Sequence, residues 1–163
     1  MSEQPAVHST FTIERSYPAP PARVFAAFAE PAIKRRWFFD GKGSTGDGYS
    51  ADFRIGGFEK SRFTFAGGPP GAPPPGTKMG NDTVYLDIVA NTRIVFAYTM
   101  LIGDRRHSVS LATVELSASG NGGTRLVFTE QAAFFEPSDG AHLREAGWRG
   151  LLSSLEKALT EGA

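Results

Sequence analysis

The sequence predicts an α+β fold in which a curved antiparallel sheet wraps around a long C-terminal helix. Alternation of apolar and polar residues, which is typical of half-buried strands, fills the middle of the chain. Helical periodicity occurs near the start and again at the end. Short turns join consecutive strands, and this favours antiparallel pairing over a parallel βαβ arrangement.

One strand and two short helices come first. Alternation over residues 11–17 predicts the opening strand. Pro21 suits the first turn of a helix over residues 22–30, since proline lacks only an N–H that would have no partner there. Pro31 interrupts this helix, and a second short one is expected to reach Trp37.

The rest of the sheet follows as a series of short strands. Alternation or apolar enrichment predicts them over residues 49–55, 62–66, 84–88, 94–102, 108–118 and 125–134. Between the first two of these, Gly56 and Gly57 indicate a bulge or kink, and we expect at least one to adopt a backbone angle unfavourable for other residues. Residues 120–123 have the composition of a hairpin turn.

The last element is a helix over residues 138–159, with Ser138 or Asp139 as N-cap. Its apolar stripe, expected to face the sheet, comprises Leu143, Gly147, Trp148, Leu151, Leu152, Leu155 and Leu159. Gly147 and Gly150 each cost about 1 kcal/mol relative to alanine in a helix interior. Either the helix approaches the sheet closely at these glycines, or space is left there for a guest molecule.

Length and composition set the class of protein. The 163 residues fit one domain, expected over residues 11–160 after a tail of residues 1–10. Equal numbers of basic and acidic residues, 17 each, argue against a nucleic-acid partner. With no cysteine, disulfides and zinc–thiolate sites are excluded. Neither a signal peptide nor a membrane-spanning stretch is evident, so a cytoplasmic protein without membrane association is expected.

Several motifs resemble functional patterns but lack the context that those patterns require. Residues 41–46 match G-x-G-x-x-G, but they follow a helix and enter a strand, which is the reverse of the dinucleotide-binding arrangement. His8, His107 and His142 lack the spacing of a helical metal pair, so neither a metal nor a cofactor is expected. The basic run 34–36 is interpreted as a solvated helix face. The Gly/Pro-rich residues 67–76 form an exposed loop, either a tolerated insertion or a lid.

Strand parity predicts an apolar pocket between the sheet and the last helix. The expected lining residues are Trp37, Phe53, Tyr98, Phe128, Glu130 and Trp148. Glu130 is the polar member: it either anchors a ligand or acts as acid or base, with Tyr98, Ser108 or Ser110 as partner, or it lies at a wet strand end.

Several segments together carry a resemblance to a known family. Residues 52–57 (DFRIGG) resemble the D-x-R-x-G-G strand end of the family of activators of the heat-shock protein 90 ATPase, in the START/SRPBCC superfamily. Residues 85–88 with 92–96 resemble its next two strands, and residues 113–116 with 122–126 its final hairpin. Residues 21–37 and the closing helix around Gly147-Trp148 are similar to its opening and closing helices, so that the resemblance covers residues 11–159.

This resemblance implies the helix-grip fold, with element order β-α-α-β6-α, but no single activity. The family usually has a shorter turn where residues 67–76 lie. Three functions stay open: a carrier or sensor of a small apolar or aromatic molecule, an interaction module that stimulates a heat-shock chaperone ATPase, and a cyclase or aromatase-type enzyme using Glu130, Tyr98 or His107. Exposed sheet edges are compatible with either a monomer or a homodimer.

Overall fold

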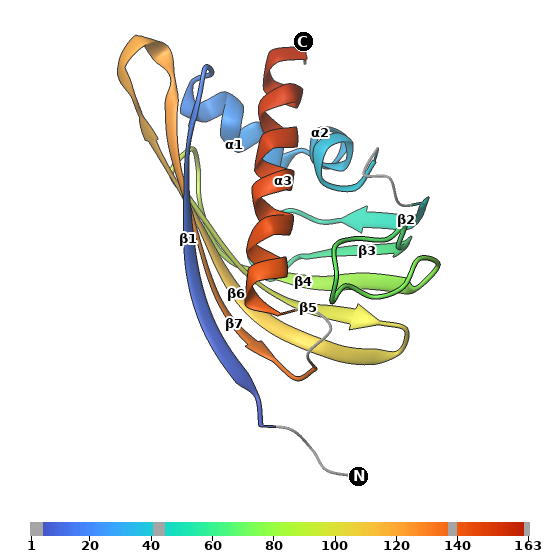
Figure 1. Ribbon diagram of the computed structural model, residues 1–163. Coiled ribbons are helices and arrows are strands. Elements are labelled where there is room, and N and C mark those ends of the chain that lie inside the picture. Colours follow the sequence, from blue (N-terminus) through green and yellow to red (C-terminus); the bar gives the residue numbers. More distant parts are fainter. Residues whose placement is uncertain (1–4, 41–44, 137–139, 162–163) are drawn as a thin grey trace.

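A seven-stranded sheet curves around one long helix in the computed structural model (Figure 1). The structure describes residues 5–40, 45–136 and 140–161. The strands are β1 (Val7–Tyr17), β2 (Thr45–Ala51), β3 (Phe58–Thr64), β4 (Lys78–Val89), β5 (Arg93–Ile102), β6 (Arg105–Ala118) and β7 (Thr124–Phe134). The helices are α1 (Pro21–Ala29), α2 (Pro31–Lys34), the π-helical turn η1 (Arg35–Phe39), the 3-10 turn η2 (Gly120–Gly122) and α3 (Ala141–Glu161). This is the predicted α+β fold with the predicted order of elements.

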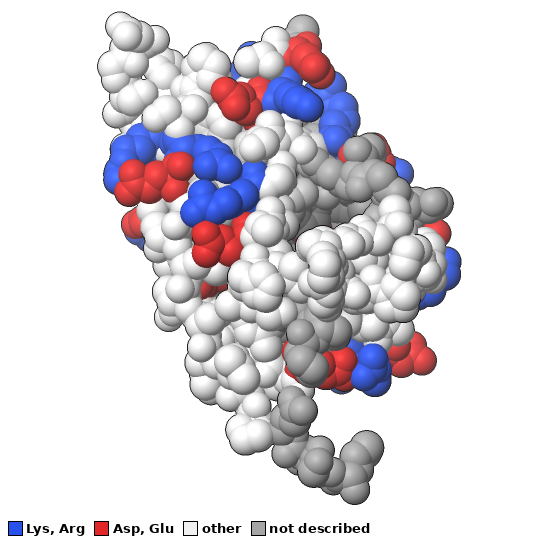
Figure 2. Space-filling view, in the orientation of Figure 1, with Lys and Arg blue, Asp and Glu red and all other residues white. Residues whose placement is uncertain are grey.

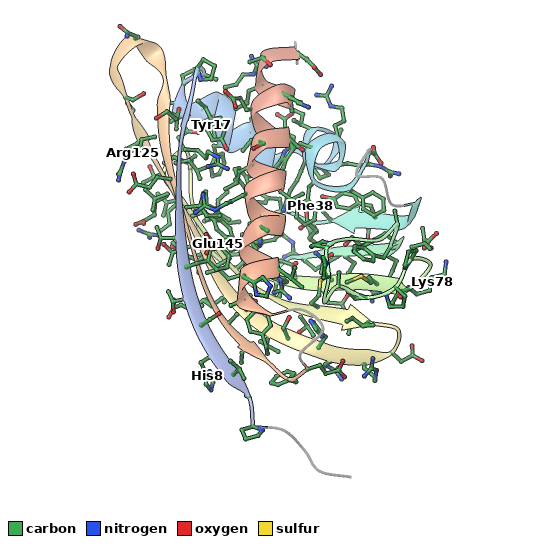
Figure 3. All side chains as sticks on the ribbon, in the orientation of Figure 1. His8, Tyr17, Phe38, Lys78, Arg125 and Glu145 are labelled. Carbon is green, nitrogen blue, oxygen red and sulfur yellow. The ribbon has the colours of Figure 1, made fainter. Side chains whose placement is uncertain are left out.

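The sheet order is β1-β7-β6-β5-β4-β3-β2, and neighbouring strands pair antiparallel. Consecutive strands from β2 to β7 are therefore neighbours, whereas β1 joins the far edge by pairing with β7. Twist and curvature give the sheet a concave face, and α3 lies along it (Figure 1). Side chains fill the space between them (Figure 3).

The core lies between the concave face and the helices. Its fully buried members include Ile13, Val24, Phe128, Leu152 and Leu155. Aromatic contacts connect the elements: the rings of Phe128 and Trp148 lie 4.2 Å apart and those of Phe28 and Trp37 5.0 Å apart. Burial of these large rings, together with the aliphatic core residues, contributes to the hydrophobic driving force for folding.

The strand predicted over residues 49–55 ends early, at Ala51. Asp52 and Phe58 exchange backbone hydrogen bonds of 2.7 and 3.1 Å and close a turn, in which Ile55 is 59% exposed. Gly56 has φ of +81°, which confirms the expected unfavourable angle. A Cβ on Gly57 would lie 2.1 Å from the Asp52 carbonyl oxygen, so both glycines are required by the turn.

Two sequence-based expectations about polar residues are corrected by the fold. Lys34 is only 2% exposed and is not part of a solvated face, although Arg35 and Arg36 are exposed as expected. Glu130 is fully buried and does not lie at a wet strand end. The proposed N-cap residues Ser138 and Asp139, and residues 41–44 of the glycine-rich run, lie outside the described residues.

The face of the molecule in Figure 2 carries basic and acidic side chains next to one another, with wide uncharged areas between them. Exposed pairs such as Arg125–Glu14, 2.8 Å apart, account for this mixture. No helix among the described residues is long and apolar enough to cross a membrane.

Candidate functional site

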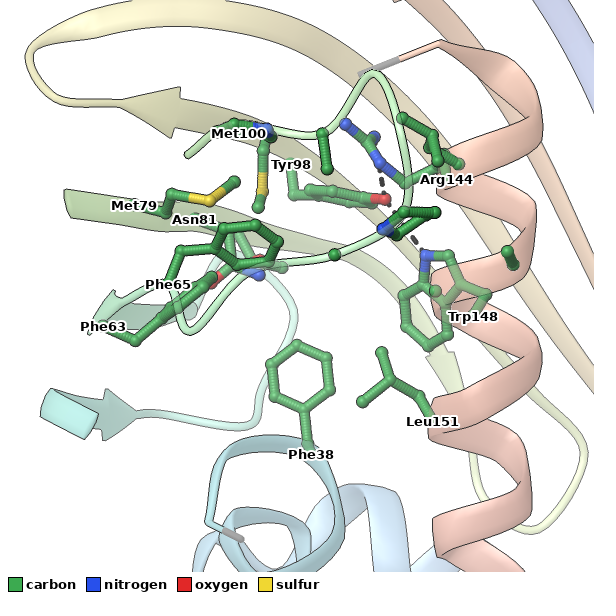
Figure 4. Close-up of a pocket in the computed structure, with 18 of the residues that line it drawn as sticks. Phe38, Phe63, Phe65, Met79, Asn81, Tyr98, Met100, Arg144, Trp148 and Leu151 are labelled. Carbon is green, nitrogen blue, oxygen red and sulfur yellow. Dashed lines mark hydrogen bonds between the residues drawn. The ribbon is translucent and has the colours of Figure 1, made fainter. Parts of the chain in front are cut away.

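A cavity of about 430 Å³ lies between α3 and the strands β3 to β5 (Figure 4). This volume is within the range of small-molecule sites, roughly 300–1,000 Å³. Aromatic side chains dominate its wall: Phe38, Phe63, Phe65, Phe96, Tyr98 and Trp148. Met79, Met100, Leu143 and Leu151 add flexible apolar surface. The wall thus suits a largely apolar guest with rings.

The Gly/Pro-rich loop forms one wall of the cavity. Gly67, Gly68, Pro69, Ala72 and Pro73 line it. The loop is closed by backbone hydrogen bonds, among them Phe65 N–H to Thr77 O (2.8 Å) and Gly76 N–H to Phe65 O (2.7 Å). The loop therefore occupies the position of a lid over the cavity.

Helix α3 presents two faces with different surroundings. Its buried residues are Arg144, Trp148, Leu152, Leu155 and Leu159, which pack toward the sheet. Leu143, Gly147 and Leu151, predicted to face the sheet, line the cavity, and both leucines are only half-buried. The predicted stripe is thus divided between core and cavity.

Gly147 distinguishes between the two explanations for glycine in this helix. A Cβ added at Gly147 would meet nothing within 4 Å, and Gly147 lines the cavity. Close helix–sheet packing is thereby excluded at this position, and space is left instead. Gly150 also has nothing within 4 Å and, like Gly147, is exposed, but it does not line the cavity.

One wall of the cavity is supported by a buried polar network centred on Tyr98. The Tyr98 hydroxyl donates to Glu130 Oε1 at 2.6 Å. It accepts hydrogen bonds from Arg144 Nη1 and Trp148 Nε1, each at 3.1 Å, as Figure 4 shows. The ring and hydroxyl of Tyr98 are held by these three partners, so that its position is well defined.

Arg144 connects the rest of this network. Its Nη1 lies 3.4 Å from Glu130 Oε2 and donates to Ser110 Oγ at 3.1 Å. Its Nη2 donates to Ser108 Oγ at 2.6 Å. Ser110 Oγ also donates to Glu130 Oε2 at 3.0 Å. Tyr98, Ser108 and Ser110, the candidate partners of Glu130 predicted from the sequence, all belong to this network.

Burial controls the protonation of this network. Burial raises the pKa of Glu130, whereas the Arg144 guanidinium and the hydrogen bonds from Tyr98 and Ser110 act in the opposite direction. Burial also raises the pKa of Tyr98, so that its hydroxyl keeps its proton at neutral pH. Tyr98 therefore acts as a donor to Glu130, not as a phenolate.

A second buried pair lies on the other side of the cavity floor. Lys34 Nζ donates to Glu59 Oε1 at 2.8 Å, and the Tyr49 hydroxyl donates to Glu59 Oε2 at 2.6 Å. The Lys34 ammonium also lies 4.4 Å from the centre of the Phe38 ring. Although burial opposes the charge of Lys34, Glu59 and Tyr85 together outweigh it and raise the pKa of Lys34.

The six residues predicted to line the pocket fall into two groups. Tyr98 and Trp148 line the cavity. Trp37, Phe53, Phe128 and Glu130 are not among its lining residues. Phe128 lies behind Trp148, and Glu130 lies behind Tyr98 and Arg144.

The other two predicted residues belong to the packing of the opening helices and the sheet. Trp37 is 1% exposed and donates from Nε1 to the Ala27 carbonyl oxygen at 2.9 Å. The ring of Phe53 packs against Tyr85 at 4.8 Å. His107, considered for catalysis, is fully buried, lies 3.8 Å from Glu136, and does not line the cavity.

Sequence reasoning missed several residues of this site. Phe63 and Phe65 alternate in β3 and its extension, and that parity could have indicated them. Arg144 lies four residues before Trp148, so its place on the buried face followed from helical spacing. Glu59 shares the parity of Phe63 on β3, but its pairing with Lys34 had no local signal, because the two residues are 25 apart in the sequence.

A metal site is not indicated by the side chains. Among residues 5–40, 45–136 and 140–161, no group of three or more His, Cys, Asp or Glu side chains is placed to hold a metal ion.

Comparison with known proteins identifies the family. A family model described as activator of Hsp90 ATPase homolog 1-like protein matches residues 18–160. The chain belongs to this family. The resemblance noted in the sequence is thereby confirmed. No curated protein matches the chain.

Solved structures of other proteins are similar to nearly the whole chain. A Rhizobium loti protein has 50% identity and a TM-score of 0.82, with 95% of this chain and 99% of that one covered. A Rhizobium leguminosarum protein has 38% identity and a TM-score of 0.83, with 96% and 97% covered. A protein of the dynemicin biosynthetic locus shares only the fold, at 20% identity and a TM-score of 0.68, with 94% and 48% covered.

Proposed function

We propose that the protein binds a small, largely apolar molecule with aromatic character in the cavity beneath residues 67–76, as a carrier or sensor. The observation that carries the proposal is the cavity itself, with six aromatic side chains on its wall and open space opposite Gly147. An apolar guest removes this surface from water, at about 25 cal/mol per Å² of apolar area buried.

The arrangement supports binding better than catalysis. The single proton of the Tyr98 hydroxyl is donated to Glu130, and its oxygen accepts from Arg144 and Trp148. A general acid needs a proton directed at the substrate, and this proton is directed away from the cavity. Glu130 itself lies behind the wall. We therefore favour binding over the cyclase or aromatase alternative.

Titration with Nile red, a neutral aromatic dye, tests the proposal. Leucine at position 147 would occupy the cavity, so Gly147→Leu is expected to weaken dye binding at least about tenfold. Gly150→Leu is the matched control, because it removes a glycine from the same helix where the side chain is exposed and outside the cavity. Its dye affinity should equal that of the wild type.

Native mass spectrometry of the purified protein provides a second measurement, since a retained small molecule would support the proposal directly. If the wild type binds no dye, or if both variants bind it equally well, the cavity is not a binding site. Stimulation of a chaperone ATPase, the activity in the family description, would then be the function to assay.

A further inference from the structure

The charged groups on the cavity wall already have partners. Glu59 receives Lys34 at one carboxylate oxygen and Tyr49 at the other. Arg144 is paired with Glu130, which also receives Tyr98. Each cation is therefore matched by a carboxylate, and binding a charged group of a ligand would require breaking one of these buried pairs.

Two uncharged side chains on β4 lie between the Lys34–Glu59 pair and the network of Tyr98. In the sheet register, Thr83 stands between Glu59 on β3 and Tyr98 on β5. Asn81 stands one pleat further along the same face and, like Thr83, lines the cavity. Across the sheet the cavity floor thus carries the Glu59 carboxylate, the Thr83 hydroxyl and the Tyr98 hydroxyl on adjacent strands, with Asn81 next to Thr83 on β4.

These two neutral groups have hydrogen-bonding capacity left. The Ser61 hydroxyl donates to the Asn81 carbonyl oxygen, and the Asn81 amide nitrogen has no partner within the described part of the chain. The Thr83 residue is only 4% exposed, and its hydroxyl likewise has no hydrogen-bond partner among the described residues. Both groups face the open cavity, so a ligand oxygen that accepts hydrogen bonds from them takes the place of water there.

Strand geometry brings both groups within reach of one ligand atom. Residues two apart on a strand point to the same face, with their Cα atoms about 6.5–7 Å apart. An oxygen between the two side chains can accept from the Asn81 amide and from the Thr83 hydroxyl. Asn81, Phe65 and Met79 all line the cavity (Figure 4), so that such an oxygen would share the cavity with the aromatic wall.

We propose that Asn81 and Thr83 bind the carbonyl oxygen of an uncharged ligand whose ring-containing body lies against Phe63, Phe65 and Trp148. This inference rests on the proposed function and narrows its ligand class to neutral ketones, amides, esters and lactones. The polar end of the ligand is thereby assigned to β4 and not to Glu130.

Prodan, a neutral naphthyl ketone, is a suitable probe, since its emission shifts to the red when its carbonyl accepts a hydrogen bond. Thr83→Val keeps the shape of the side chain and removes the hydroxyl, so the Kd for Prodan should rise about fivefold to tenfold, with blue-shifted emission. Asn81→Leu should have a similar effect. Thr83→Ser should retain wild-type affinity, because it restores the hydroxyl.

Two controls isolate the carbonyl contact. Dimethylaminonaphthalene, which lacks the ketone, should bind the wild type and Thr83→Val equally. Thr99→Val changes a threonine on the other face of β5, outside the cavity lining, and should leave the Kd for Prodan unchanged. Because Asn81→Leu removes the acceptor of the buried Ser61 hydroxyl, its fold is checked by circular dichroism, and Thr83→Val tests the proposal independently.

The outcomes separate this inference from the proposed function. If Prodan binds the wild type and Thr83→Val with equal affinity and equal emission, the β4 anchor is wrong while binding in the cavity stands. If the anionic anilinonaphthalene sulfonate binds the wild type more tightly than Prodan, the preference for a neutral ligand is wrong. If the wild type binds neither Prodan nor dimethylaminonaphthalene, both this inference and the proposed function fail.

Discussion

Arg144 joins helix α3 to three strands of the sheet through its side chain. It reaches Glu130, Ser108, Ser110 and Tyr98 from α3 and so connects the helix to strands β5, β6 and β7. Its guanidinium also lies 5.2 Å from the centre of the Phe134 ring. A fork of N–H donors is well suited to such a role, since a lysine could not bond in several fixed directions at once.

Removal of Arg144 should destabilise the protein strongly. In Arg144→Met, Glu130 stays buried without its cation, and the free energy of unfolding should fall by about 3–5 kcal/mol at neutral pH. Arg149→Met is the control on the same helix: Arg149 pairs with Glu145 at the surface, and such pairs contribute less than about 1 kcal/mol. Urea unfolding measures both. Equal losses in the two variants would contradict a stabilising role of the buried pair.

Glu130 should make stability depend on pH in a defined direction. Its pKa in the folded protein is raised above the ordinary value of 4.5, chiefly by burial, so the folded state holds the proton more tightly than the unfolded state does. The resulting stabilisation is present below the unfolded pKa and is lost as pH rises through the folded pKa.

The matched comparison is Glu130→Gln, which cannot titrate. As pH rises from about 4 to about 7, the wild type should lose free energy of unfolding relative to this variant. Urea unfolding at several pH values measures the difference. A difference that grows in favour of the wild type would show that the ion pair with Arg144 outweighs the cost of burial.

At the scale of the element, α3 combines a packed face with a face left open. The packed side buries Leu152 and Leu155 completely against the sheet. On the other side, Gly147 and Leu151 line the cavity. The helix is 21 residues long, and its two faces allow it to complete the core and to border an empty volume at the same time.

These two faces should respond differently to truncation. Leu155→Ala creates a hole in the core and should lower the free energy of unfolding by about 2–5 kcal/mol. Leu151→Ala truncates a half-buried side chain that already borders the cavity. The free energy of unfolding should therefore fall by less than about 2 kcal/mol. Thermal and urea unfolding compare them. A loss under about 0.5 kcal/mol for Leu155→Ala would mean that this face is not core.

At the scale of the whole molecule, the cavity is enclosed by parts that are distant in sequence. Strands β3 to β5 supply the floor, α3 one side, η1 the end at Phe38 and residues 67–76 the remaining wall. The loop between β3 and β4 thus has a defined place over the cavity although it contains mostly glycine and proline.

Shortening this loop should affect binding more than stability. If residues 67–75 are replaced by Ser-Gly-Ser, one wall of the cavity is lost, and Nile red affinity should fall about tenfold. The free energy of unfolding should change by less than about 1 kcal/mol, because the loop lies outside the main core. Shortening the turn at residues 120–123, far from the cavity lining, is the control. Unchanged dye affinity would show that the loop is a tolerated insertion.

The sequence by itself determined the order of elements and the identity of most core positions. Period-two and helical patterns are local, and each strand or helix displays its buried face within a few residues. This is why β5 was predicted with its inward Tyr98, and why the turn at Gly56 was recognisable. Trp148 was assigned to the buried side of the helix for the same reason.

Only the tertiary structure decided which inward side chains border open space and which pack behind them. Phe128 and Tyr98 have the same parity, yet Tyr98 lines the cavity and Phe128 lies behind Trp148. The pairing of Lys34 with Glu59, and the place of residues 67–76 over the cavity, likewise needed the fold. A cavity is the volume that distant elements fail to fill together, and a local pattern describes one element at a time.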